Sequence, residues 1–382
     1  MAGLYIHVPL CGGQRCIYCD FYSTLFRGNP LSLTQAYVQE LKDRLRHDGW
    51  EGTRFRTLYF GGGTPSQLAG AHVKQLLADL SEVIDGSELE EVTLEANPED
   101  VTPHYLRGLF RSKRDLAPWR VNRVSLGVQS FDNAMLTFLG RRHDAARVGT
   151  AVRDLRERGV QNISIDLMYG LPGQTMTAWR ETIARAIDLG VEHVSAYALS
   201  VEPGTPLASM VAAGRVELPD EELVLEMASH LRFRLEKAGY VQYEISNYAR
   251  PGFESRHNSA YWTGEPYLGL GPGAHSYDGR RTRSWNAPDL AAYLMGRCDR
   301  DHETLTDTDL FNERIMLGLR TRRGVNLDAL RNAFPGLLDE DAVAGLIEDR
   351  LLCMADGCLR LTGDGLAVAD NIIRRLFAVP QD

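Results

Sequence analysis

The chain has 382 residues, 44% of which are hydrophobic, and a formal net charge of −9 at neutral pH. This length supports one large domain with a smaller one beside it. The acidic balance argues against general nucleic-acid binding, which needs a positive field. No run of about 18 apolar residues predicts a transmembrane helix. The opening sequence MAGLYIHVPL lacks the basic region and long apolar run of a signal peptide. We therefore expect a cytoplasmic protein that binds no nucleic acid.

Short strand-like segments alternate with helical segments over the first 200 residues. The segments rich in Val, Ile, Leu and Tyr are 4–10, 56–62, 90–97, 122–129, 162–170 and 193–201. Helical spacing of apolar residues is found at 34–46, 71–84, 146–159 and 177–190. This alternation predicts parallel βαβ units. Six units are too few to close an eight-fold barrel, so we expect an α/β fold with an open, partial (βα)6 barrel. In such folds the chemistry lies at the C-terminal ends of the strands.

The rest of the chain predicts additions to the barrel and a small second domain. A helix at 220–239 and a strand at 241–249 precede a glycine-rich, aromatic stretch. From about residue 305 the pattern predicts helices at 307–320, 326–333 and 338–349, a hairpin that turns at ADG, and a last helix at 363–377. Helices with a hairpin indicate a winged-helix-like α+β domain. We therefore divide the chain into a barrel core (1–240), a barrel extension (241–304) and a C-terminal domain (305–382).

Three cysteines, Cys11, Cys16 and Cys19, follow the first predicted strand in a C-x4-C-x2-C pattern. Six cysteines in a chain of this length are not a disulfide framework, and the cytosol keeps thiols reduced. A tight cluster in that setting indicates metal binding or catalysis. Three thiolates could hold three irons of a four-iron cluster and leave the fourth iron open. A zinc site with His7 as the fourth ligand, or purely structural thiols, are the alternatives.

Polar and glycine-rich residues follow the other predicted strands. In YFGGGTPS, which ends the second strand, three consecutive glycines would let a ligand approach the backbone. Glu95 and Gln129 end the third and fourth strands, Arg141 lies in FLGRRHD, and Asp166 lies within ISIDLMYG. A carboxylate inside such an apolar run needs a partner if it is buried. Together these groups would suit the amine, carboxylate and ribose of a nucleoside amino acid.

Six motifs occur in one order along the chain: YIHVPLC…CIYCDF, GGGTPS, LEANPE, SLGVQSFD, DLMYGLPGQT and HNSAYW…YLGLGPGAHS. With these motifs the chain resembles the HemN-like radical SAM proteins, from about residue 4 into the C-terminal domain. Within that family it most resembles the HemW branch of heme chaperones.

The resemblance implies a [4Fe-4S] cluster on Cys11, Cys16 and Cys19, with S-adenosylmethionine (SAM) chelating the open iron. By motif position it implies SAM contacts from Tyr5, Tyr18, Gly62, Gly63, Thr64, Glu95, Gln129, Arg141 and Asp166. In this family the reduced cluster donates one electron and cleaves the sulfonium to give a 5′-deoxyadenosyl radical, while the protein orients the cofactor.

One feature departs from the family pattern, which is C-x3-C-x2-C. Here four residues, 12–15, separate Cys11 from Cys16. The additional residue either forms a local bulge in a loop that contains two glycines or displaces Cys11.

The resemblance also separates two branches of the family. The oxygen-independent coproporphyrinogen oxidases carry an N-terminal extension and a further cysteine two residues after the third cluster ligand. Here the first strand begins at Leu4, and Phe21 stands in the place of that cysteine. The HNSAYW segment (257–262) is similar to the heme-chaperone signature HNxxYW. A neutral imidazole such as that of His257 is a common axial ligand of heme iron. The alternative is that His257 is a hydrogen-bonded structural residue.

We therefore expect a heme chaperone that binds heme, a [4Fe-4S] cluster and SAM and transfers heme to respiratory hemoproteins. The alternative is an oxygen-independent coproporphyrinogen III oxidase of porphyrin biosynthesis, which decarboxylates two propionates. The sequence leaves open whether the chain is an enzyme, whether it forms a dimer, and whether it reaches a membrane surface through a partner.

Overall fold

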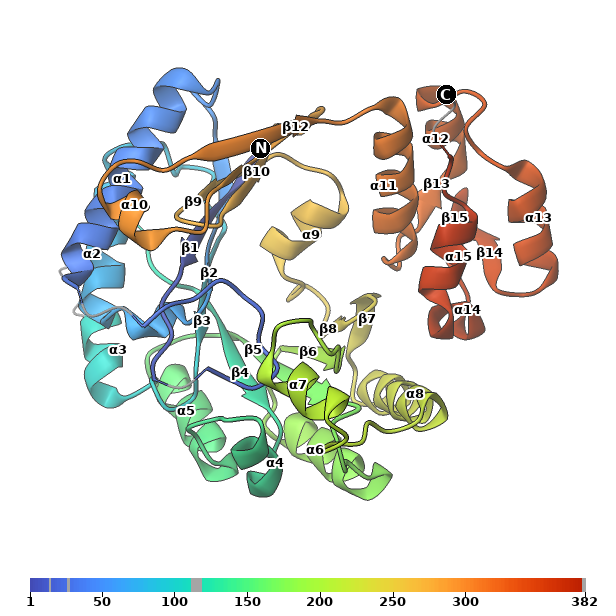
Figure 1. Ribbon diagram of the computed structural model, residues 1–382, viewed down its shortest axis with the longest axis horizontal. Coiled ribbons are helices and arrows are strands. Elements are labelled where there is room, and N and C mark those ends of the chain that lie inside the picture. The colour runs from blue at the N-terminus through green and yellow to red at the C-terminus, as the bar shows by residue number, and fades with distance from the viewer. Residues whose placement is uncertain (14, 26–27, 111–118, 380–382) are drawn as a thin grey trace.

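The computed structural model describes residues 1–13, 15–25, 28–110 and 119–379. Its N-terminal half is a curved sheet of six parallel strands with helices on the convex side (Figure 1). The strands are β1 (Ala2–Val8), β2 (Phe55–Gly62), β3 (Glu91–Ala96), β4 (Arg123–Gln129), β5 (Asn162–Tyr169) and β6 (His193–Ala198). The helices that connect them are α1 (Pro30–His47), α2 (Gly70–Ser81), α3 (Pro103–Leu109), α4 (Asn133–Phe138), α5 (Ala145–Glu157) and α6 (Met176–Asp188). The expected α/β class and open barrel are confirmed.

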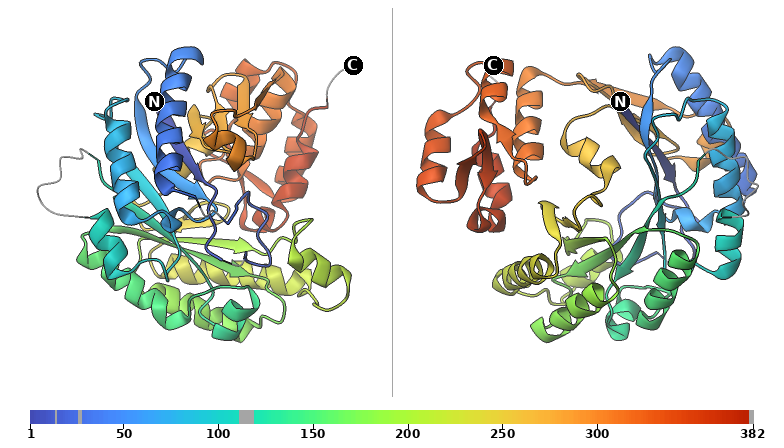
Figure 2. Two further views of the ribbon diagram at one scale, coloured as in Figure 1. Left: turned by 60° about the vertical axis from the view of Figure 1, so that its left-hand side comes forward. Right: turned by 180° about the vertical axis from the view of Figure 1, so that it is seen from behind.

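Later segments extend this sheet at both edges to twelve strands, in the order β12-β11-β10-β9-β1-β2-β3-β4-β5-β6-β8-β7 (Figure 2). The added strands are β7 (Val241–Glu244), β8 (Asn247–Ala249), β9 (Tyr267–Leu270), β10 (His275–Tyr277), β11 (Thr282–Asn286) and β12 (Arg300–Thr304). The helices of this part are α7 (Pro206–Ala212), α8 (Glu221–Lys237), α9 (Arg256–Trp262) and α10 (Leu290–Leu294). β9 runs parallel to β1, whereas β8 runs antiparallel to β6.

The single strand expected at 241–249 is wrong, because the chain turns between β7 and β8. The Glu244 carboxylate accepts a hydrogen bond from the amide of Ser246 at 3.0 Å and also bonds the side chain of Asn247. These contacts hold a tight turn, so β7 folds back and pairs antiparallel with β8.

Side chains of the parallel strands alternate between an apolar outer face and a polar inner face, as the two-residue period of a strand requires. Leu58, Phe60, Val124 and Leu126 are buried in the core beneath the helices. Their neighbours face the concave side and are polar; Thr57, Thr93, Arg123, Ser164 and His193 are examples, and all are buried. The interior of this barrel is therefore a polar wall suited to a ligand, unlike the branched apolar filling of a closed eight-fold barrel.

The C-terminal segment packs around its own hydrophobic core, which includes Phe311, Ile315, Leu346 and Leu359. Its elements are α11 (Asp307–Leu319), β13 (Val325–Asn326), α12 (Leu327–Ala333), α13 (Glu340–Glu348), β14 (Leu352–Ala355), β15 (Cys358–Leu361), α14 (Gly363–Ala367) and α15 (Ala369–Arg375). The expected hairpin is present, and Asp356 and Gly357 at its turn both have positive φ.

The single helix expected at 363–377 is wrong, because it is broken into α14 and α15. Val368 leaves the helical region with φ −124° and ψ 27°. The break changes the direction of the chain, so that Ile372 and Ile373 pack in the C-terminal core.

Two backbone hydrogen bonds join this segment to the turn between β7 and β8. The amide of Ile245 donates to the carbonyl of Arg320 at 2.9 Å, and the amide of Arg322 donates to the carbonyl of Tyr243 at 3.0 Å. An ion pair between Arg283 and Glu313 adds a contact from β11 to α11. Among the described residues, none of the helices has the length and apolar character needed to cross a lipid bilayer.

Candidate cofactor site in the barrel

The cysteine loop begins where β1 ends and is fixed to its surroundings by backbone hydrogen bonds. The amide of Cys11 donates to the carbonyl of Thr24 at 3.1 Å, and the amide of Cys19 donates to the carbonyl of Cys16 at 3.2 Å. Between them, the amide of Ile17 donates to the carbonyl of Leu139 at 3.2 Å. The three thiols are free and half-buried. The loop therefore presents three sulfur donors at the C-terminal end of the barrel strands.

The additional residue of the C-x4-C spacing lies in a glycine-containing part of this loop, in which Gln14 is outside the described residues. Gly13 has φ +93° and open space around it, whereas a side chain at Gly12 would overlap Gln67. Because its amide is bonded to Thr24, Cys11 stays beside the end of β1. The conformational freedom of Gly13 lets the loop take up additional length.

The donor set suits an iron–sulfur cluster, in which each thiolate binds a different iron. Arg141 donates from Nη1 to Sγ of Cys16 at 3.4 Å. Among the described residues, no three His, Cys, Asp or Glu side chains converge on a position for one metal ion. His7, the fourth ligand of the zinc alternative, has both ring nitrogens engaged, with the Tyr5 hydroxyl at 3.1 Å and the Tyr22 carbonyl at 3.0 Å. His7 therefore has no free ring nitrogen for the fourth position of a tetrahedral zinc site.

The GGGTPS segment brings the end of β2 close to the cysteine loop. Gly62 has φ +109°, and a Cβ there would lie 2.7 Å from the His7 ring. A Cβ on Gly63 would lie 2.5 Å from the carbonyl oxygen of Leu10. Thr64 is buried and stands at the start of the short 3-10 helix Pro65–Gln67. Only glycine allows this approach, so Gly62 and Gly63 let the end of β2 pack closely against the chain that leads into the cysteine loop.

Glu95 supplies a carboxylate to the same end of the barrel. The Tyr59 hydroxyl donates to its Oε1 at 2.6 Å, and the amide of Gly62 also bonds the carboxylate. Burial raises the pKa of Glu95 to about 7, against the effect of these hydrogen bonds. Tyr5 stacks beside Tyr59 with ring centroids 6.1 Å apart. An ammonium group placed beside Glu95 would hold it ionised.

Arg141 links the strand ends to the cysteine loop. Its Nη2 donates to Oδ1 of Asn97 and to the carbonyl of Gly127, both at 2.6 Å. Gln129 ends β4 with φ +65°, and a Cβ on Gly127 would lie 3.1 Å from the Arg141 guanidinium and 3.2 Å from the Gln129 amide. Arg141, Gly127 and Gln129 therefore lie together, and Arg141 also contacts Cys16. Asn97 was not among the predicted site residues, although it lies within the LEANPE motif.

Tyr18 and Asp166 complete the predicted set. Burial raises the pKa of Tyr18, whose hydroxyl bonds Cys16. Asp166 on β5 accepts a hydrogen bond from Ser125 at 3.2 Å and another from Ser195, while burial raises its pKa. Asp166 thus has partners of the kind expected for a buried carboxylate. Tyr18 packs against the apolar cluster of Leu139, Met168 and Leu171.

Arg123, at the start of β4, is an interior cation that the sequence reasoning missed. It is 2% exposed, its Nε is buried without a partner, and no hydrogen bond or ion pair joins its guanidinium to another described residue. Its charge lowers the pKa of Glu95 and of Asp166, against the dominant effect of burial. The signal was available, since Arg123 falls on the inward-facing positions of RVSLGVQ.

The HNSAYW segment forms most of α9, which lies on the concave side of the sheet (Figure 1). His257 is 1% exposed, with Nδ1 2.8 Å from the Thr57 hydroxyl and Nε2 2.8 Å from the Tyr261 hydroxyl. Its ring stacks on Tyr59 at 4.9 Å, and its amide donates to Glu91 at the start of β3. Burial lowers the pKa of His257 to about 3, so the ring is neutral. His257 thus lies toward the N-terminal ends of the strands, and the cysteines lie at the opposite ends.

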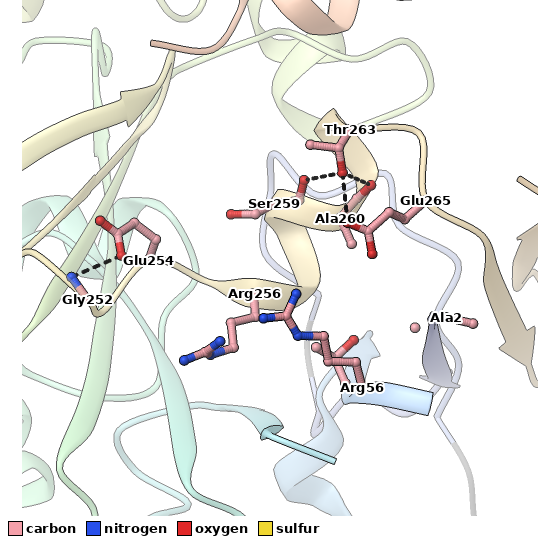
Figure 3. A pocket seen from close by; sticks show the side chains of 11 residues that line it. Ala2, Arg56, Gly252, Glu254, Arg256, Ser259, Ala260, Thr263 and Glu265 are labelled. Atoms are coloured by element: carbon pink, nitrogen blue, oxygen red, sulfur yellow. Dashed lines mark hydrogen bonds between the residues drawn. The ribbon is translucent and has the colours of Figure 1, made fainter. Parts of the chain in front are cut away.

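A pocket of about 280 Å³ opens beside α9 (Figure 3). Arg256, Ser259 and Ala260 of α9 line it, with Thr263 directly after that helix and Arg56 from β2. Both arginines pair with Glu90. The volume is slightly below the roughly 300–1,000 Å³ of typical ligand pockets.

Comparisons with known proteins agree with this architecture. Residues 5–186 match the family model of the radical SAM superfamily, and residues 305–368 match that of the HemN C-terminal domain. The solved structure of coproporphyrinogen III oxidase (HemN) from Escherichia coli aligns with a TM-score of 0.80 at 22% identity, over 98% of this chain and 90% of that one. The fold and the cysteine loop thus define a radical SAM protein with the HemN architecture, and this family implies a [4Fe-4S] cluster and SAM.

Curated relatives identify the branch. Heme chaperone HemW of Lactococcus lactis is 35% identical, over 98% of this chain and 96% of the relative. Heme chaperone HemW of Bacillus subtilis is also 35% identical, over 97% and 98%. The mitochondrial radical S-adenosyl methionine domain-containing protein 1 of Bos taurus is 35% identical, over 100% and 88%. The chain belongs to the HemW group of the HemN-like radical SAM family.

Proposed function

We propose that the chain is a heme chaperone, which binds heme and passes it to respiratory hemoproteins. The observation that carries this proposal is the 35% identity to proteins named heme chaperone HemW over nearly the whole length of both chains. The HNSAYW segment, similar to the heme-chaperone signature, gives further support. The polar interior of the barrel is compatible with a protein that binds cofactors as well as its cargo.

The cofactors are proposed to bind at the C-terminal ends of the strands. Cys11, Cys16 and Cys19 would hold a [4Fe-4S] cluster, which supplies single-electron chemistry to SAM when both are bound. Glu95 would accept a hydrogen bond from the amino group of SAM, and Arg141 would bind its carboxylate. The remaining proposed SAM contacts are Tyr5, Tyr18, Gly62, Gly63, Thr64, Gln129 and Asp166.

His257 is the proposed axial ligand of heme iron. Its neutral ring is the form that binds iron. Iron could reach Nε2 only after the hydrogen bond to Tyr261 breaks, because the 2.8 Å contact occupies that nitrogen. Because the His257 ring is also buried against Thr57 and Tyr59, heme ligation at this residue requires α9 to move away from β2. Exchange between this packed state and a ligated state would give the protein a way to release heme.

Anaerobic reconstitution with iron and sulfide, followed by hemin titration, tests this function. We expect about four irons and four sulfides per chain, a Soret band on hemin addition, and heme transfer to the apo form of a respiratory cytochrome b. Apomyoglobin in place of the cytochrome measures passive loss of heme. Transfer at equal rates to both acceptors would contradict chaperone activity. A colourless protein with zinc and no sulfide would contradict the cluster.

The same preparation tests the alternative enzyme. Coproporphyrinogen III, SAM and a reductant are added under anaerobic conditions, and the tetrapyrrole products are separated by chromatography. Phe21 stands where the oxidases carry a further cysteine, so we expect no protoporphyrinogen. Its formation would establish the oxidase reaction.

A further inference from the structure

A groove of about 690 Å³ lies between the barrel edge and the C-terminal segment. It is lined by α8, β7, the end of α11, β15 and α14. Its volume falls within the roughly 300–1,000 Å³ of ligand pockets. It is separate from the cysteine loop and from α9, whose residues do not line it.

Four arginines line this groove: Arg232, Arg320, Arg322 and Arg360. Two glutamates, Glu236 and Glu244, also line it. The lining is therefore cationic in a chain whose net charge is −9. Such a concentration of one sign of charge in a cleft attracts ligands of the opposite sign.

The arginines are incompletely paired. Arg320 bonds Asp370 at 2.7 Å, and Arg360 bonds Asp356 at 3.1 Å, but these carboxylates are 65% and 86% exposed. The Nε of Arg320 is buried without a partner. In the described parts of the chain, no side-chain hydrogen bond or ion pair engages the guanidinium of Arg322. Guanidinium groups with spare donors bind carboxylates in bidentate fashion.

Apolar side chains lie between these charges. Val241, Ile245, Leu319, Leu361 and Leu366 all line the groove. None of the described lining residues is a histidine, cysteine or methionine. The lining tyrosine, Tyr240, is buried and donates its hydroxyl to the carbonyl of Val191, so these residues offer no free axial ligand for iron. The combination suits a ligand with a large apolar body and two anionic groups.

We propose that this groove is a docking site for a porphyrin dicarboxylate such as heme, with its carboxylates on Arg322, Arg320 and Arg360. The proposal rests on the proposed heme-binding function and gives it a site that does not depend on His257. Heme would be held here through its propionates and its apolar ring, without an iron–protein bond from the groove.

Charge reversal of two of the arginines tests this proposal on the full-length chain. Hemin affinity is measured by tryptophan fluorescence quenching for the wild type and for the double variant Arg322→Glu/Arg360→Glu. We expect binding at least tenfold weaker in the variant. Arg323→Glu is the matched control, because Arg323 adjoins Arg322 and does not line the groove. Metal-free protoporphyrin IX should bind within about threefold of hemin, and its dimethyl ester at least tenfold more weakly.

The outcomes separate the groove from the wider function. An unchanged affinity in the arginine variant, or equal binding of the acid and the ester, would overturn the docking site. If His257→Ala abolishes hemin binding while the arginine variant retains it, the chaperone proposal stands and the groove is not the heme site. If the wild type binds no hemin, the chaperone proposal falls and the groove falls with it. Circular dichroism of each variant establishes that it is folded.

Discussion

The hydroxyl of Tyr261 lies 2.8 Å from Nε2 of His257, one helical turn away on α9. This bond, with that from Thr57 to Nδ1, leaves neither ring nitrogen free. The bonds from His257 to Thr57 and Glu91 hold α9 against the N-terminal ends of β2 and β3. Tyr261 of the motif therefore acts in packing as well as in any contact with heme.

Tyr261→Phe removes the partner of Nε2 of His257. The affinity for hemin should rise several-fold, because iron can then bind Nε2 without first breaking a hydrogen bond. The unfolding free energy should fall by about 1–3 kcal/mol, the usual cost of an unpaired buried polar group. Hemin titration and urea unfolding measure both effects. Tyr267→Phe is the control, since that ring contacts Tyr261 at 4.6 Å without bonding His257. An unchanged or weaker hemin affinity in Tyr261→Phe would exclude Nε2 of His257 as the ligand.

Replacing any one of Cys11, Cys16 or Cys19 by serine should prevent stable cluster assembly, because each thiolate holds a different iron. Iron and sulfide content after anaerobic reconstitution should fall to near background in each variant. Cys353→Ser, which changes a half-buried thiol on β14, is the control and should retain the full content. A variant at Cys11 with wild-type iron and sulfide would mean that Cys11 is not a ligand despite its position.

Asn97→Ala should weaken SAM binding by about tenfold without loss of the cluster. The Asn97 side chain accepts a 2.6 Å hydrogen bond from Arg141, and charge-assisted bonds of this kind contribute roughly 1.5–3 kcal/mol. Without it, the guanidinium is less well aimed at the SAM carboxylate. Calorimetric titration of SAM into the reconstituted protein measures the change. Asn133→Ala removes an amide from α4 that bonds Ala145; a similar loss of affinity there would show that the effect is not specific to Arg141.

Glu95 should make the stability of the SAM-free protein depend on pH. Its pKa in the folded state is about 7, above the usual value. Between about pH 4.5 and pH 7 the folded state therefore holds a proton that the unfolded state has released. The resulting stabilisation of the folded state is complete below about pH 4.5 and is lost as the pH rises through 7.

Urea unfolding between pH 5 and pH 8 compares the wild type with Glu95→Gln. The variant should become more stable relative to the wild type as the pH rises. Glu90→Gln is the control, because Arg56 lowers the pKa of Glu90 and its titration lies below this range. A constant difference between wild type and Glu95→Gln would contradict the raised pKa.

Much of the barrel follows from local sequence patterns. The parallel strands are read from apolar runs such as SIDLM, and the hairpin from ADG, because both signals act over a few residues. The turn at Ile245 depends on the Glu244 carboxylate, and the break at Val368 depends on packing into the C-terminal core. These are tertiary effects, so the strand at 241–249 and the helix at 363–377 were each predicted as one element.

In the candidate site, too, the sequence patterns did not predict contacts between residues far apart in the chain. Motifs predicted the cysteines, Glu95 and Arg141 as site residues, but they did not indicate that Asn97 bonds Arg141 or that Tyr59 bonds Glu95. They also did not indicate that Arg123 would be a buried cation among carboxylates. Such relations arise between strands, where a residue meets partners that are 30 or more positions away. The division into segments 1–240, 241–304 and 305–382 stays a prediction.

The parallel pairing of β1 with β9 affects how the chain is made. Leu4 and Ile6 align with Leu268 and Leu270, more than 260 residues later. During translation one edge of β1 therefore stays unpaired until the ribosome has synthesised about two thirds of the protein. Such a long wait slows folding and leaves an apolar strand edge open to aggregation. Yields from expression should therefore improve when synthesis is slowed by lower temperature.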